Sequence, residues 1–112
     1  MDLTKKRCVP CEGGALPLSA GQIAIYSSKT PGWEVIEDKK LKREAKFKSF
    51  AEAMKFVNEV ARLAETEGHH PDIHVFYNLV RLELTTHAIG GLSENDFILA
   101  AKINLLQKPN PA

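Results

Sequence analysis

The chain has 112 residues, of which 15 are Lys or Arg, 14 are Asp or Glu and 44% are apolar. This length allows one domain with a single core, and the balanced charge removes any whole-protein reason to expect nucleic-acid or membrane binding. No apolar run approaches the roughly 18 to 20 residues of a membrane span. Basic residues 5–7 resemble the start of a signal peptide, but Pro10, Glu12 and Gly13 stand where its apolar core would be. We therefore expect a cytoplasmic protein.

Cys8 and Cys11 form a C-x-x-C pair in a segment rich in glycine, proline and charge. A closed zinc site usually needs four ligands, and the chain has no second cysteine pair. A thioredoxin-type redox pair would open a helix after a strand, which is not the setting here. Three interpretations remain: an inert arm, which we favour, a metal or disulfide shared between subunits, and redox chemistry. We expect residues 1–16 to form an arm, residues 17–107 to form a single domain, and residues 108–112 to form a tail. Within the arm, residues 1–14 are expected to contribute no core side chain.

Residues 18–47 predict a short helix followed by a β-hairpin. Ser19 is a plausible N-cap for a helix over residues 18–26, and Pro31 with Gly32 ends regular structure after it. Apolar and polar residues then alternate over 33–35 and again over 41–47, with a polar turn between them and Arg43 as the one exception.

The next segment predicts a long helix. Residues 49–52 have the pattern of a capping box, and Gly68 is a C-terminal stop signal. The apolar face is expected to consist of Phe50, Met54, Val57, Ala61 and Ala64.

Residues 72–87 alternate twice, with a change of phase at Asn78, and predict a second hairpin in which Tyr77 packs. A second capping box over 93–96 begins a last helix, whose face is expected to consist of Phe97, Ile98, Ala101 and Leu105. The order α-β-β-α-β-β-α predicts an α+β two-layer domain with a roughly four-stranded antiparallel sheet and helices on one face. Because open strand edges favour association, we expect a homo-oligomer, either a dimer or a tetramer.

Three of the four histidines, His69, His70 and His74, lie within six positions. His70 and His74 would share a helix face, but Pro71 and the alternation after it indicate extended chain. Four extended residues span roughly 13 Å, too far for both rings to reach one metal ion. The simplest alternative is that His69 and His70 are polar loop residues at the negative end of a helix dipole.

The fourth histidine, His87, is expected to end the second hairpin on the polar side of its strand. Because antiparallel strands lie about 5 Å apart, a hairpin entered after His70 and left at His87 brings its ends together. Imidazole titrates near neutrality, so a pair can supply one proton donor and one acceptor, as elimination or addition of water requires. We therefore predict a metal-free acid/base site.

The spacing of these residues resembles the signature of the pterin-4a-carbinolamine dehydratase family over residues of about 17 to 106. The motif consists of Glu65, His69, His70, Pro71, Tyr77, His87 and Asp96. The resemblance implies dehydration of 4a-hydroxytetrahydropterin to quinonoid dihydropterin, without a cofactor, which recycles the pterin used by an aromatic amino-acid hydroxylase.

The resemblance also implies roles for individual residues. His69 and His87 would be the acid/base pair, His70 would hold the pterin, and the remaining positions would border or support the site: Thr85, Thr86, Glu65, Pro71 and Asp96. Helix capping alone also explains Asp96, and Glu65 also fits a solvated residue of a last helical turn.

Three positions depart from animal members of the family, namely Ile73, His74 and Ala88, which affects ring packing and substrate preference. An alternative function is a non-catalytic assembly or coactivator-type interaction protein, since some relatives have such roles. Retention of all three motif histidines favours the enzyme.

Overall fold

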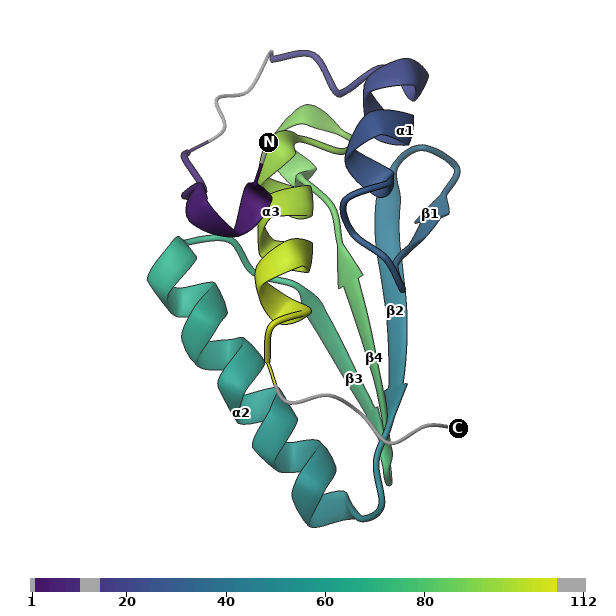
Figure 1. The fold of residues 1–112 in the computed structure, drawn as a ribbon, viewed down its shortest axis with the longest axis vertical. Coiled ribbons are helices and arrows are strands. Elements are labelled where there is room, and N and C mark those ends of the chain that lie inside the picture. Colours follow the sequence, from purple (N-terminus) through teal and green to yellow (C-terminus); the bar gives the residue numbers. More distant parts are fainter. Residues whose placement is uncertain (1, 11–14, 107–112) are drawn as a thin grey trace.

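The computed structural model describes residues 2–10 and 15–106. Its elements in chain order are the 3₁₀ helix η1 (Leu3–Lys5), α1 (Ala20–Ser27), β1 (Glu34–Ile36), β2 (Lys40–Lys46), α2 (Phe50–Glu67), β3 (Asp72–Phe76), β4 (Leu79–Leu84), the 3₁₀ helix η2 (His87–Ile89) and α3 (Glu94–Ile103). The strands form one antiparallel sheet in the order β1-β2-β4-β3, and α2 and α3 lie over one of its faces (Figure 1). The predicted α+β fold is confirmed.

Both predicted hairpins are present, and alternate residues of β2 and β4 are buried in the hydrophobic core, whereas Phe76 at the end of β3 is 51% exposed. The buried strand residues are Leu41, Ala45, Val80, Leu82 and Leu84. The exception to the alternation, Arg43, has a polar partner beyond the end of α3, since its Nη1 donates to Asn104 Oδ1 at 2.6 Å. Trp33 Nε1 donates to the same oxygen at 3.0 Å. The positive charge of Arg43 is also favourable at this position, because it lies next to the negative C-terminal end of α3.

Helix α2 begins and ends where the sequence predicts, but its buried face differs. Ser49 caps the N-terminus and Gly68 ends the helix in the left-handed conformation, with φ of 67°. The predicted face is wrong in part: Ala64 is buried as predicted, but Phe50 is 51% exposed and the other buried residues are Ala53, Phe56 and Val60. Two apolar stripes with the same helical period lie side by side on this helix, and packing against the sheet selects the one that contains Phe56.

Two predicted packing residues lie in solvent instead. Leu105 is 71% exposed because α3 ends at Ile103. The capping box predicted at the start of α3 is present. Tyr77 is 69% exposed because it forms the β3–β4 turn, with φ of 56°. Helix α3 lies at the centre of the domain and is buried on nearly every side.

The N-terminal segment departs most from expectation. Leu3 is only 2% exposed and belongs to the hydrophobic core, so the prediction that residues 1–14 contribute no core side chain is wrong. Cys8 is half-buried, and burial, together with the neighbouring Glu67, raises the pKa of its thiol to about 12. Cys11 lies outside the described residues, so the shared-metal and disulfide interpretations remain predictions. Within 2–10 and 15–106, no helix is both long and apolar enough to cross a membrane.

Candidate active site

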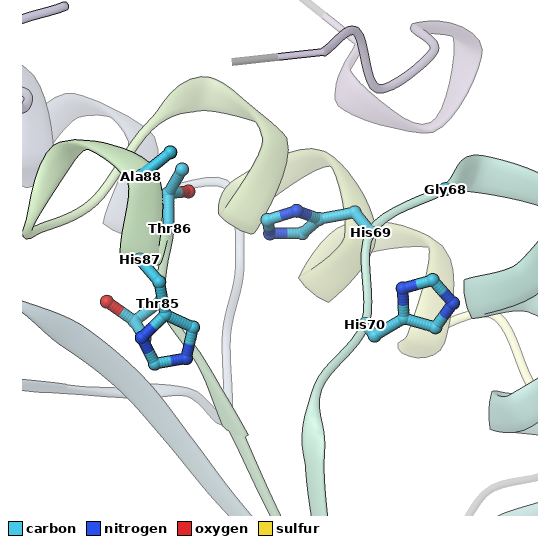
Figure 2. A pocket seen from close by; sticks show the side chains of 7 residues that line it. All are labelled: Gly68, His69, His70, Thr85, Thr86, His87 and Ala88. Carbon is cyan, nitrogen blue, oxygen red and sulfur yellow. The ribbon is translucent and has the colours of Figure 1, made fainter. Parts of the chain in front are cut away.

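A cavity of about 310 Å³ opens at the end of the sheet where α2 leads into β3 and where β4 ends (Figure 2). Its lining residues are Gly68, His69, His70, Thr85, Thr86, His87 and Ala88. The two ends of the second hairpin therefore meet as the sequence predicts. One detail differs: β4 ends at Leu84, and His87 begins the 3₁₀ turn η2 instead of ending the strand.

His69 is held by a buried carboxylate. Its Nε2 lies 2.6 Å from Asp96 Oδ1, and the side chains of His69 and Asp96 are 13% and 0% exposed. An ionised carboxylate only accepts hydrogen bonds, so Nε2 carries the proton in this contact. The other ring nitrogen, Nδ1, is then left to exchange a proton with a bound molecule.

Asp96 is fixed by more than its contact with His69. Its Oδ2 accepts hydrogen bonds from the Ser93 N–H at 2.9 Å and from Thr86 Oγ1 at 2.8 Å. The Ser93 bond belongs to the capping box of α3, so the capping interpretation of Asp96 holds together with a second role. Because both carboxylate oxygens of Asp96 have hydrogen-bond partners, the side chain can stay buried and still orient the imidazole of His69.

His70 points the other way. Figure 2 shows the rings of His69 and His70 on opposite sides of the backbone that joins them, with His87 on the side of His69. The His70 Nε2 contacts Glu65 Oε2, and these two side chains are 58% and 78% exposed. An exposed ion pair of this kind contributes little to stability, so the His70 side chain can exchange its contact with Glu65 for one with a bound molecule at the rim of the cavity.

The remaining positions fall into two groups. His87 and Ala88 are exposed at the cavity wall, and Thr85 Oγ1 donates to the Lys39 carbonyl at 2.6 Å. Thr86, in contrast, is 5% exposed and directs its hydroxyl to Asp96. Pro71 connects the cavity rim to β3.

Sequence reasoning singled out Ala88 as a position that affects substrate preference, but it did not identify the hydrogen bond of Thr86 to Asp96 or the place of Gly68 in the cavity wall. Gly68 carries a signal for its backbone conformation, the helix stop, but no signal for a ligand. Within the described residues, no group of three or more His, Cys, Asp or Glu side chains is arranged to hold a metal ion.

The fold and the cavity define an α+β domain with a histidine–carboxylate site at one end of an antiparallel sheet. Residues 16–106 match the family model described as pterin 4 alpha carbinolamine dehydratase. The chain belongs to this dehydratase family, and the family predicted from the sequence is confirmed.

Known relatives cover nearly the whole chain. A putative pterin-4-alpha-carbinolamine dehydratase from Nitrosospira multiformis is 50% identical over 105 residues, which make up 94% of this chain and 92% of that protein. The mitochondrial pterin-4-alpha-carbinolamine dehydratase 2 of Arabidopsis thaliana is 50% identical over 95% of this chain and 59% of its own length.

Solved structures show the same fold. A transcriptional coactivator/pterin dehydratase from Brucella melitensis superposes with a TM-score of 0.73 and 32% identity, over 78% of this chain and 94% of that one. A pterin dehydratase-like RuBisCO assembly factor of the alpha-carboxysome superposes with a TM-score of 0.56 and 23% identity, over 68% of this chain and 89% of that one. At that identity the second likeness concerns the fold alone.

Proposed function

We propose that this protein dehydrates 4a-hydroxytetrahydropterin to quinonoid dihydropterin. The observation that carries the proposal is the His69–Asp96 pair, which lies in a cavity that His87 also lines, in a chain whose family and relatives are pterin-4-alpha-carbinolamine dehydratases. A cavity of about 310 Å³ is at the lower end of the size range of small-molecule sites.

The reaction needs one proton donor and one proton acceptor. The C–O bond at the carbinol carbon breaks as the hydroxyl takes up a proton and leaves as water. The adjacent ring N–H loses its proton, and the carbon–nitrogen double bond forms. One of His69 and His87 donates and the other accepts, and each returns to its starting state by exchange with solvent.

Asp96 has a positioning role in this scheme. It fixes the tautomer and the orientation of His69, so that Nδ1 is the nitrogen offered to the pterin. His70 holds the pterin at the rim, where its ring is exposed and supported by Glu65. Thr85 borders the bound ring system, and Pro71 keeps the rim segment extended.

The proposed reaction uses no metal and no cofactor, because imidazoles alone supply both proton transfers. We further propose that it recycles the pterin of an aromatic amino-acid hydroxylase in the cytoplasm. β1 and β3 stand at the two edges of the sheet, which supports a homo-oligomer, either a dimer or a tetramer.

A stopped-flow measurement tests the proposal. Freshly generated carbinolamine is mixed with buffer, with the protein, or with the protein treated with a chelator, and dehydration is followed by absorbance. We expect a concentration-dependent acceleration that survives the chelator. A rate equal to that in buffer would refute the dehydratase, and activity lost together with stoichiometric metal would refute the metal-free site.

The alternative function is an interaction protein that does not catalyse. The Brucella melitensis protein is described as a transcriptional coactivator as well as a pterin dehydratase. The same stopped-flow measurement separates the two functions, since a purely interacting protein leaves the rate of dehydration unchanged.

A further inference from the structure

Residues 3–9, which we call the N-terminal strap, pack against the helical layer of the domain. Figure 1 shows η1 beside α3 and near the C-terminal end of α2. Leu3 is 2% exposed within the core, and Lys6 Nζ forms an ion pair with Glu94 Oε2 at 2.8 Å. The strap lies outside residues 16–106, the part that matches the family model.

The backbone of the strap is hydrogen-bonded to both α2 and α3. The Cys8 N–H donates to Glu67 Oε1 at 2.9 Å. The Val9 N–H donates to Asn95 Oδ1 at 3.0 Å, and the Val9 carbonyl accepts from Asn95 Nδ2 at 2.5 Å. The strap therefore joins the last turn of α2 to the first turn of α3.

These anchors stand next to the two residues that meet in the cavity. Glu67 lies two residues before His69, and Asn95 directly precedes Asp96. The His69 N–H donates back to the Ala64 carbonyl at 3.3 Å, so the position of His69 follows that of the last turn of α2. The His69–Asp96 contact thus joins the same two elements as the strap.

The buried carboxylate of Glu67 receives one of its hydrogen bonds from the strap. Its side chain is 8% exposed, and its Oε2 accepts from Lys102 Nζ of α3 at 2.7 Å while its Oε1 accepts from the Cys8 N–H. Burial alone would raise the pKa of Glu67, but the Cys8 N–H and Lys102 hold this pKa below its ordinary value. A buried carboxylate that loses a donor is destabilised, so detaching the strap would disturb the junction of α2 and α3.

We propose that the N-terminal strap is a positioning element that fixes the end of α2 against the start of α3 and so holds His69 against Asp96. Its effect on catalysis rests on the proposed dehydratase function. Its effect on the His69–Asp96 hydrogen bond does not. The Cys8 atom that anchors Glu67 is the backbone N–H, whereas the thiol makes only a long hydrogen bond, to the Asn95 carbonyl at 3.5 Å, so the strap should hold without the thiol.

Two pairs of matched variants test the strap. Cys8→Pro removes the N–H that binds Glu67, whereas Cys8→Ala keeps this N–H and removes only the thiol. Asn95→Ala removes both side-chain bonds to Val9, whereas Asn104→Ala makes the same substitution beyond the other end of α3, where the side chain bonds Trp33, Arg43 and the Pro31 carbonyl instead of the strap. The readouts are the low-field proton NMR signal of the His69–Asp96 hydrogen bond and the separate values of kcat and KM.

We expect Cys8→Pro and Asn95→Ala each to shift or broaden the low-field signal and to lower kcat about tenfold, because a misplacement of about 1 Å can cost on the order of 100-fold. KM should change little, since the strap does not line the cavity. The double variant should lose no more than either single variant, because both changes release the same strap.

The controls decide the outcome. An unchanged signal and kcat in both Cys8→Pro and Asn95→Ala would overturn the proposal, as would equal losses in Cys8→Ala or Asn104→Ala. If Cys8→Pro does not fold by circular dichroism, Asn95→Ala decides the test, because it leaves the chain of the strap intact. Should the unaltered protein show no dehydratase activity, the proposed function fails, while the NMR signal still tests the strap.

Discussion

Asp96→Asn tests the orientation of His69 with almost no change in volume. Oδ1 of the Asp96 carboxylate accepts a hydrogen bond from His69, and Oδ2 accepts hydrogen bonds from Thr86 and Ser93. An asparagine has one acceptor oxygen, which the two donors on the Oδ2 side would retain. Its NH₂ group would then face His69 Nε2 and force this nitrogen to accept, which moves the ring proton to Nδ1.

The expected loss follows from the bond that disappears. A hydrogen bond to a charged group contributes about 1.5 to 3 kcal/mol. At 1.36 kcal/mol for each factor of ten, this corresponds to a fall in kcat of roughly 10- to 150-fold. The fold should persist, because the asparagine still accepts from Ser93 at the N-terminus of α3.

The assay is the stopped-flow dehydration rate at saturating substrate, with circular dichroism to confirm folding. Glu65→Gln is the matched control, since Glu65 also contacts a histidine but is 78% exposed. An exposed pair contributes at most about 1 kcal/mol, so kcat of the control should fall less than about fivefold. The reasoning would be refuted by a wild-type kcat in Asp96→Asn, or by a larger loss in Glu65→Gln.

Three further predictions concern His70, Leu3 and Cys8. His70→Ala should raise KM more than it lowers kcat, because the ring points away from His87 (Figure 2), and an unchanged KM in steady-state kinetics would contradict this role. Leu3→Ala should lower the free energy of unfolding by about 2 to 5 kcal/mol in a denaturant titration, since Leu3 is 2% exposed in the core, and an unchanged midpoint would place Leu3 outside it. Alkylation of Cys8 at pH 7.5, followed by peptide mass mapping, should be about a thousandfold slower than that of a free thiol, because the pKa of Cys8 is raised to about 12 from 9.0. Alkylation at the rate of free cysteine would show an exposed thiolate and contradict this prediction.

The elements of the fold were predictable because their signals are local. Ser19 marks a helix start as an N-cap, Ser93 marks one through its capping box, and Gly68 marks a helix end through its left-handed conformation. The change of phase near Asn78 places the turn between β3 and β4. Each of these signals depends on residues within one turn of the position that it marks.

Features that depend on packing were not predictable. Helix α2 carries two apolar stripes of equal period, and nothing within the helix shows that Phe56 is buried while Phe50 is 51% exposed. The strap has no periodicity, and its bonds reach across 59 positions to Glu67 and 86 positions to Asn95. Such contacts form only when the whole domain is assembled.

The candidate site was predictable in part for the same reasons. The hairpin geometry brings His87 to the same end of the sheet as His69, and the family resemblance singles out Asp96. The hydrogen bond of Thr86 to Asp96 depends on the turn after β4 and on the start of α3, which the sequence does not place relative to each other.

The most direct test of the proposed mechanism compares the wild-type protein with His69→Ala and His87→Ala in the stopped-flow dehydration assay. A positioned acid or base group contributes typically 100- to 10,000-fold, so we predict that each variant folds normally and loses about 10- to 1,000-fold of the catalysed rate. Wild-type rates in both variants would show that these histidines do not transfer the protons.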